Sequence, residues 1–361
     1  MERLTVLQVA YPLARVGPDA VGGAEQVIGA LDSSLVRAGH LSLVIACEGS
    51  SCAGTLLLTP RWERFSEAVW GPAHRAHRQA IGEALRGYDV DLVHLHGVDF
   101  NAYLPPPGPP ALVTVHLPKH QYPGDYPFPD RPKTWYGCVS ASQRRTFPPD
   151  APLLDPIPNG VDLNVFHPRS RKRAFALSLG RVCPEKGFHL ALEAAKSADL
   201  PLALGGEVFP YPNHQRYFAE EIQPRLDAHR RFLGPLDLRR KARLLAAACC
   251  LVIASQIDET SSLVAMEALA SGTPVIAFPA GAVSEIVEDG RTGFLVHDVN
   301  GIAAALRRVP TLDPQECRRV AEERFPVDRM ARRYLDLYRR LAAGDLPWRS
   351  WKTPALSSVS T

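Results

Sequence analysis

The chain has 361 residues, which is long for a single hydrophobic core, so two domains are expected. Hydrophobic residues make up 46% of the sequence and charged residues 22%, as is usual for globular proteins. A net charge of +3 is too small to indicate binding to nucleic acid. The opening residues lead directly into a strand pattern rather than a signal peptide, and no apolar run of about 18 residues could span a bilayer. These features predict a cytoplasmic protein.

The cysteines and arginines also bear on where the protein is located. The seven cysteines form no zinc-like CxxC pair, and most lie in or beside apolar runs, which is typical of buried free thiols in a reducing compartment. Near the end of the chain the sequence has a cluster of arginines: Arg318, Arg319, Arg329, Arg332, Arg333, Arg339 and Arg340. Acidic residues interrupt this cluster, which favours a solvated helical face, with peripheral contact to a membrane as the alternative.

The first half of the chain alternates short apolar runs with helical patterns. A helix is expected over residues 24–38, where Val27, Leu31 and Leu35 recur at four-residue spacing. Strands are expected at residues 4–10, 41–46, 91–96, 111–116 and 135–140, whereas residues 49–80 are less regular. Such alternation predicts a parallel, doubly wound sheet of the α/β class.

The composition changes at residues 155–168, which hold several prolines and an Asn-Gly turn, and a second series follows. Its strands are expected at residues 174–180, 201–205, 231–234, 250–255, 274–278 and 293–296, with helices at 188–198 and 238–247. Only helices follow residue 300. We therefore predict Rossmann-like domains at 1–168 and 169–325, facing each other across a cleft. A terminal helix at 326–345 and a disordered tail at 346–361 complete the prediction.

Two glutamates mark the second series. Glu259 falls in a strand-to-helix loop and Glu267 on the helix that follows, at the sheet edge where α/β proteins bind ligands. Eight helical residues rise roughly 12 Å, whereas two carboxylates that act on one glycosidic bond lie about 5–9.5 Å apart. A hydrolase-type pair is therefore disfavoured. The carboxylates can accept hydrogen bonds from hydroxyls, and the free N–H groups at the start of the helix can donate to a phosphate. This combination favours a nucleotide-sugar site.

Other loops offer further contacts to such a ligand. Arg181 and Lys186, between Gly180 and Gly187, are two cations suited to a diphosphate, although a surface pair between Arg181 and Glu185 is the alternative. In the first domain, Gly22-Gly23 opens a helix and gives room for a phosphate. His116 ends a strand and is expected to point into the cleft.

Two patterns suggest metal ligands at first sight. Asp89 and Asp91 form a DxD sequence, but they begin a strand and so lie at the edge of the sheet opposite the cleft. His94 and His96 share one face of a strand without a third convergent ligand. We interpret both patterns as structural and expect no metal or other cofactor.

In this order, the motifs resemble those of retaining glycosyltransferases of family 4, which have the two-domain GT-B fold. The resemblance covers residues 22 to about 296 and rests on Gly22-Gly23-Ala-Glu25, Thr114-Val-His116, Ile157-Pro-Asn159-Gly160-Val-Asp162, Gly180-Arg181, Lys186-Gly187, Phe232-Leu-Gly234, the Glu259–Glu267 spacing and Gly272-Thr-Pro274. It implies terminal helices that cross back to the first domain.

The resemblance also implies a role for each site residue. Arg181 and Lys186 would hold the diphosphate of a UDP- or GDP-type sugar donor, Glu259 the sugar hydroxyls and Glu267 the ribose. The N–H groups near Ser262 and Leu263 would contact the phosphate, and the loop at Leu236 would face the base. From the first domain, Gly23 and His116 would reach the donor. The family commonly has an aromatic residue and a glycine where this chain has Thr260, Ser261 and Ser262, whose hydroxyls could donate to phosphate.

The implied reaction is metal-independent transfer with retention to an acceptor hydroxyl of a glycan, lipid or small molecule. The acceptor would bind at residues 49–80 and 117–134, where aromatic residues offer stacking surfaces: Trp62, Trp70, Tyr122 and Tyr126. Two alternatives stay open at this point: a sugar-nucleotide epimerase of the GT-B fold, and a non-catalytic partner protein that binds a nucleotide sugar.

Overall fold

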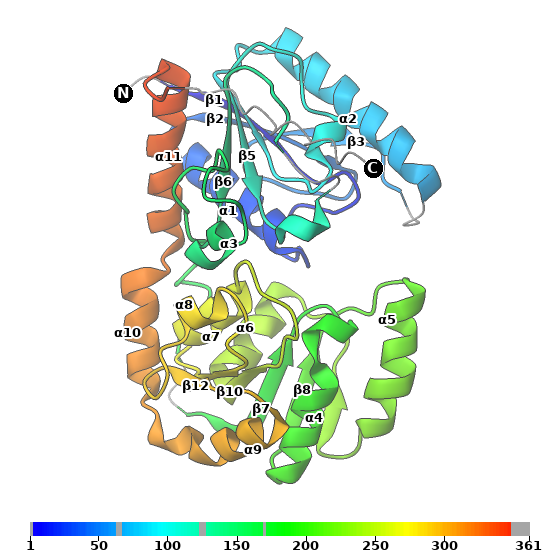
Figure 1. Ribbon diagram of the computed structural model, residues 1–361, viewed down its shortest axis with the longest axis vertical. Helices are drawn as coiled ribbons and strands as arrows, with labels where there is room; N and C mark the ends of the chain where they lie inside the picture. The colour runs from blue at the N-terminus through cyan, green and yellow to red at the C-terminus, as the bar shows by residue number, and fades with distance from the viewer. Residues whose placement is uncertain (1–2, 63–66, 123–127, 169–170, 348–361) are drawn as a thin grey trace, which may run out of the picture.

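The computed structural model describes residues 3–62, 67–122, 128–168 and 171–347, and folds them into two α/β domains, one above the other (Figure 1). Each domain is built on a parallel sheet of six strands. The expected GT-B architecture is therefore correct. The end of the tail, the residues at the expected domain boundary and Tyr126 lie outside the described residues.

In the first domain the elements are β1 (Thr5–Val9), α1 (Gly23–Arg37), β2 (Leu41–Cys47), β3 (Thr55–Thr59), α2 (Glu67–Gly87), β4 (Leu92–Leu95), β5 (Ala111–Val115), β6 (Thr134–Cys138) and α3 (Ala141–Arg145). In the second they are β7 (Arg173–Leu179), α4 (Phe188–Ser197), β8 (Leu202–Gly205), α5 (Pro212–Tyr217), β9 (Arg230–Phe232), α6 (Leu238–Ala247), β10 (Ala248–Ile253), α7 (Leu263–Ala270), β11 (Val275–Ala277), α8 (Val283–Ile286), β12 (Gly293–Leu295) and α9 (Val299–Arg308). The helices α10 (Pro314–Arg324) and α11 (Val327–Ala343) follow.

The two sheets share one topology. Their orders are β3-β2-β1-β4-β5-β6 and β12-β11-β10-β7-β8-β9, so each runs outward in both directions from its first strand. This is the doubly wound Rossmann order, in which ligands bind at the carboxyl ends of the strands near the point where the order reverses. In both domains that point lies between the first and fourth strands. The loops after β1, β4, β7 and β10, with the neighbouring loop after β5, are therefore the ones that can form a site.

One part of the first domain differs from the sequence prediction. Residues 49–80 are not irregular, because they contain β3 and most of α2. The sequence pattern does not indicate this helix, because it contains Gly71, Pro72 and Gly82, which have low helix propensity. Burial of Ala73, His77 and Ile81 against the sheet outweighs those local preferences.

The last helix of the described chain returns to the first domain. Figure 1 shows α10 beside the second domain and α11 alongside the first. Tyr334 and Tyr338 of α11 are buried in one apolar cluster with Val27, Leu31 and Leu35 of α1. The apolar stripe that predicts α1 is thus covered by the end of the chain, as the GT-B fold requires.

The two connections between the domains are joined to each other. The backbone N–H of Val161 donates to Phe325 O at 2.9 Å, and that of Val327 donates to Val161 O at 3.0 Å. A Cβ atom on Gly160 would lie 2.8 Å from Pro326 O, so only glycine permits this approach. The outgoing and returning segments therefore cross between the domains as a hydrogen-bonded pair.

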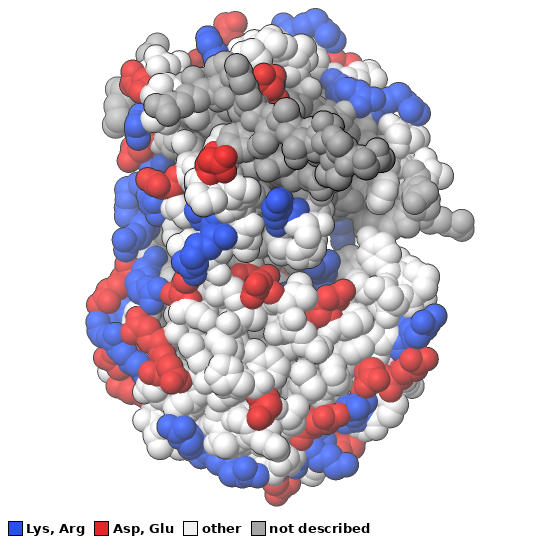
Figure 2. Space-filling view, in the orientation of Figure 1, with Lys and Arg blue, Asp and Glu red and all other residues white. Residues whose placement is uncertain are grey.

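The clustered arginines belong to α10 and α11. Arg318 pairs with Glu322, and Arg319 pairs with Glu316 and Glu323. Figure 2 shows basic and acidic side chains interspersed along this edge of the molecule. These pairs agree with the solvated helical face favoured by the sequence. Among the described residues, we find no helix with the length and apolar character needed to cross a bilayer.

Candidate functional site

The site lies where the loops after β5 and β10 meet. The hydroxyl of Thr260 donates to the backbone oxygen of His116 at 2.6 Å, and Asn159 Nδ2 donates to Ser261 Oγ at 3.0 Å. Gly23 faces Leu263, whose Cδ1 atom would be 3.5 Å from a Cβ atom at that glycine. Gly23, His116 and Asn159 come from three predicted motifs, and the structure brings them against the Glu259–Glu267 motif.

Lys186 and Glu259 form the most direct contact between predicted site residues. The Lys186 Nζ atom lies 2.5 Å from Glu259 Oε1, and the hydroxyl of Ser255 also donates to this oxygen. The two side chains are only 21% and 12% exposed. Opposite charges at this distance in a partly desolvated place interact strongly and hold each other in position. The loops after β7 and β10 thus present one positive and one negative group side by side.

The charge of Arg181, on the same loop as Lys186, acts on the carboxylate of Glu25, a residue to which the sequence assigns no role. Burial raises the pKa of the Glu25 carboxyl, and the charge of Arg181 opposes that rise. Gly22 lies against Glu25 so closely that a Cβ atom at Gly22 would overlap a carboxylate oxygen. Glu25 could have been singled out from its place in the Gly22-Gly23-Ala-Glu25 motif. Arg181 itself is exposed, and its charge also acts on Glu185.

Glu267 is on α7, as predicted, and is buried rather than paired at the surface. Its Oε1 atom accepts from Lys241 Nζ at 2.5 Å, while Oε2 is buried without a hydrogen-bond partner among the described residues. Burial raises the pKa of Glu267, and Lys241 opposes the rise. A carboxylate oxygen with no partner can accept a hydroxyl of a ligand. Lys241, from α6, was missed because no local pattern links it to Glu267.

Ser262 and Leu236 complete the predicted donor contacts. Ser262 is the N-cap residue of α7 and is buried, so the first N–H groups of that helix begin at the cleft. The side chain of Leu236, in the loop before α6, covers Gly205 at the end of β8, where a Cβ atom would meet Leu236 Cδ1 at 2.5 Å. Leu236 therefore lies at the carboxyl edge of the second sheet, beside the loop that carries Arg181.

His116 is the end of a buried group of imidazoles. Its Nε2 atom lies 3.0 Å from His96 Nδ1, and burial lowers the pKa of His116 to about 4. His94 uses both ring nitrogens, one with Tyr338 at 2.7 Å and the other with Thr114 at 2.8 Å. The structural interpretation of His94 and His96 fits these contacts. His116 is a neutral imidazole at pH 7; its ring contacts His96, and its backbone oxygen contacts Thr260 across the cleft.

The DxD sequence has a structural task at the opposite edge of the sheet. Asp91 Oδ2 accepts from the backbone N–H of Thr5 at 2.7 Å, at the start of β1. That position is the amino end of a parallel strand, away from the loops that hold Arg181 and Glu259. The contact supports the interpretation of Asp91 as structural.

An interdomain pocket of about 990 Å³ opens beside Glu259. The first domain contributes Lys119 and His120 and the second contributes Asp258 and His297, among other residues. The predicted acceptor region at 117–134 therefore supplies part of the pocket. Tyr122 also lines it, but its hydroxyl accepts from the backbone N–H groups of His116 and Leu117, so it positions the loop after β5 rather than offering a free stacking face.

Known proteins resemble both the sequence and the fold. Residues 163–324 match the family described as glycosyl transferases group 1. A D-inositol 3-phosphate glycosyltransferase from Nocardioides sp. is 33% identical over 231 residues, which are 54% of this chain and 50% of that protein. The chain thus spans about half the length of the curated relatives that it matches.

Solved structures extend the comparison to nearly the whole chain. AviGT4, a glycosyltransferase involved in avilamycin A biosynthesis, is 26% identical with a TM-score of 0.72, covering 97% of this chain and 100% of its own. Sucrose-phosphate synthase from Thermosynechococcus elongatus shares the fold, with a TM-score of 0.79 at 21% identity over 95% of this chain and 100% of its own. The chain therefore has the GT-B fold of these glycosyltransferases, and its residues 163–324 are similar in sequence to the glycosyl transferases group 1 family.

Proposed function

We propose that this chain is a retaining glycosyltransferase of family 4 that moves a sugar from a UDP- or GDP-type donor to an acceptor hydroxyl. The observation that carries the proposal is the contact between Lys186 and Glu259 in the loop before α7, within the residues that match the group 1 family. The next residue, Thr260, contacts the first domain. A cation and free N–H groups at one cleft match the diphosphate of a nucleotide-sugar donor, and a carboxylate beside them matches its sugar hydroxyls.

In this proposal the main requirement for catalysis is to stabilise the negative charge that develops on the leaving group in the transition state. Cleavage of the anomeric C–O bond leaves a diphosphate that gains negative charge, while the sugar ring becomes positively charged. Arg181 and Lys186, together with the N–H groups at the start of α7, supply positive charge that is already in place. One preorganised donor of this kind contributes about 3 kcal/mol to the transition state. The leaving phosphate would accept the proton of the acceptor hydroxyl, and the new bond would form on the same face of the sugar.

The two glutamates serve as separate contacts along one extended donor. Glu259, oriented by Lys186 and Ser255, would accept hydrogen bonds from the sugar hydroxyls. Glu267, with one buried oxygen lacking a partner, would accept from the ribose. His116 and Gly23 would contact the donor from the first domain, and Leu236 would face the base.

The acceptor would enter through the pocket lined by Lys119, His120 and His297. A volume of about 990 Å³ is at the upper end of pockets that hold small molecules. It borders Ser255, a direct partner of Glu259, so an acceptor hydroxyl there would lie on the sugar side of the donor. We propose a polar acceptor, either a small molecule or the end of a glycan or lipid-linked glycan.

A panel of UDP- and GDP-sugars, tested with and without candidate acceptors, distinguishes transfer from the alternatives. Release of nucleoside diphosphate that depends on acceptor supports transfer, and the anomeric configuration of the product, determined by NMR, tests retention. Donor epimerisation without release would support an epimerase instead. Binding without turnover across the panel would support the non-catalytic partner protein and contradict both enzymatic readings.

We further propose that transfer needs no metal, because the positive charge comes from side chains and N–H groups. Turnover should be unchanged by EDTA in the assay. Loss of turnover with EDTA, restored by Mg²⁺ or Mn²⁺, would contradict this part of the proposal and return attention to Asp89 and Asp91.

A further inference from the structure

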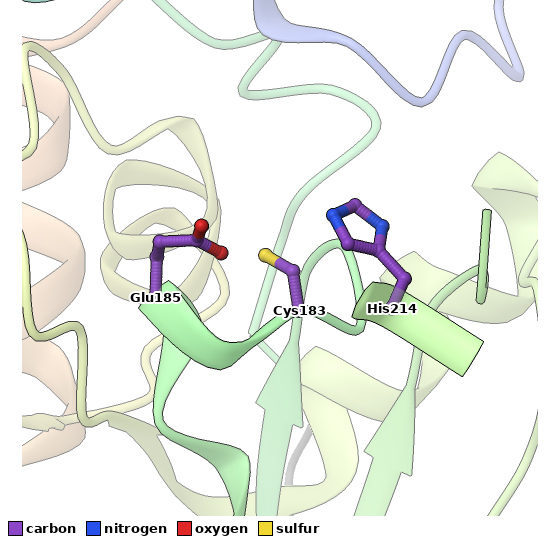
Figure 3. Close-up of side chains that lie close together, drawn as sticks. All are labelled: Cys183, Glu185 and His214. Atoms are coloured by element: carbon purple, nitrogen blue, oxygen red, sulfur yellow. The ribbon is translucent and has the colours of Figure 1, made fainter. Parts of the chain in front are cut away.

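Three side chains of different chemistry meet at the exit of β7. Cys183 and Glu185 belong to the loop between β7 and α4, and His214 belongs to α5, nearly thirty residues further along the chain. Their ligand atoms all lie within 4.8 Å of one another. Figure 3 shows the Glu185 carboxylate and the His214 imidazole on either side of the Cys183 thiol, both turned toward it. We propose that Cys183, Glu185 and His214 form a binding site for Zn²⁺.

The surroundings of the three residues favour a metal over a chance contact. Cys183 is 2% exposed and His214 is 7% exposed, so both are held in place by packing. Glu185 is half-buried and leaves a side from which an ion can enter.

The donor set selects the kind of metal. Thiolate, imidazole and carboxylate together suit Zn²⁺, whereas Mg²⁺ and Ca²⁺ prefer oxygen ligands alone. Around a tetrahedral zinc ion, a sulfur and a nitrogen ligand lie about 3.5 Å apart. The observed separations of up to 4.8 Å therefore close with small side-chain rotations. Coordination forms a bond to the Cys183 sulfur and releases its proton to solvent, and water would occupy the fourth position.

The site would join two segments that are distant in the sequence and already packed against each other. Cys183 and Glu185 lie between Arg181 and Lys186, and the Cys183 carbonyl accepts from the Lys186 N–H at 3.1 Å. The backbone oxygen of Glu185 also accepts from Gln256 N at 2.8 Å, in the loop that leads to α7. Zinc would attach this loop to α5. The ion would thus act on the structure of this loop and take no part in the transfer chemistry, and transfer itself would not require it.

The test is direct metal binding by the full chain, stripped of metal with a chelator and titrated with Co²⁺ as a spectroscopic substitute for Zn²⁺. We expect one equivalent to produce a thiolate-to-cobalt absorption band with the visible bands of a tetrahedral site, and Zn²⁺ to abolish them. Cys183→Ser and His214→Gln should each lose the thiolate band or weaken Co²⁺ binding at least tenfold. Cys52→Ser removes a more accessible thiol outside the site and should behave like the wild type.

Thermal unfolding gives a second measurement. Zinc should raise the unfolding midpoint of the wild type and of Cys52→Ser by several degrees, because it binds the folded state, and should not do so for His214→Gln. Absence of a thiolate band in the wild type, or its persistence in Cys183→Ser, would overturn the proposal. Zinc stabilisation equal in wild type and both site variants would do the same. These measurements need no sugar donor, so they stand even if no transferase activity is found.

Discussion

Replacing Lys186 by alanine removes the cation that holds Glu259 and is proposed to stabilise the leaving diphosphate. The loss of one preorganised charge-bearing donor is worth about 3 kcal/mol, which corresponds to a rate reduction of roughly 100-fold. Glu259 keeps its contact with Ser255, and both charged side chains are partly exposed, so the fold should survive. We therefore expect kcat to fall about 100-fold while the unfolding midpoint changes by only a few degrees.

The assay is release of nucleoside diphosphate under saturating donor and acceptor, with KM measured for each. Lys196→Ala, at the exposed end of α4, is the matched control because it removes a lysine from the same helix-and-loop unit without approaching the site. Lys186→Arg keeps the charge and should recover part of the rate. A Lys186→Ala rate within about threefold of wild type would refute the reasoning, as would a loss that appears in KM alone.

Three further predictions concern groups around the site. Lys241→Met should leave Glu267 buried without its cation, a change that costs about 3–5 kcal/mol; the unfolding midpoint should fall, and adding Glu267→Gln should restore most of it. Thr260→Val removes the hydroxyl that contacts the β5 loop across the cleft, so kcat/KM should fall severalfold with an unchanged midpoint, and an unaffected rate would contradict that role. Burial lowers the pKa of His77 to about 4, so the unfolded chain binds this proton first as pH falls below about 6.5. The free energy of unfolding, measured by urea titration, should therefore decrease by about 3 kcal/mol from this group between pH 7 and pH 4, and His77→Phe should remove that part of the decrease.

The repeating patterns of the sequence are sufficient to predict most elements of both sheets. The spacing of Val27, Leu31 and Leu35 predicts α1, because a helix at the surface buries one face. The apolar runs predict the strands, because both faces of a parallel sheet are covered by helices. The sequence pattern does not predict α2, because Gly71 and Pro72 lower its helix propensity. The helix forms because it packs against the sheet.

The site was predictable where a motif is local and not where a contact spans distant segments. Glu259, Glu267 and Lys186 stand out by their position after strands, but Lys241 is connected to Glu267 only through the packing of α6 on α7. Cys183 and His214 are a similar case, because no CxxC or HxxxH spacing brings them together. Pairs of this kind depend on tertiary structure, which local sequence patterns do not encode.

The hydrogen-bonded crossing at Val161 limits how the cleft can open. Two separate tethers would let the domains slide and twist independently, but these two are bound to each other beside Gly160 and Pro326. We therefore expect them to act as a single pivot, so that the domains would open by rotation about that point rather than by sliding. A donor of the kind proposed would then be enclosed beside Lys186 and Glu259 as the rotation is reversed.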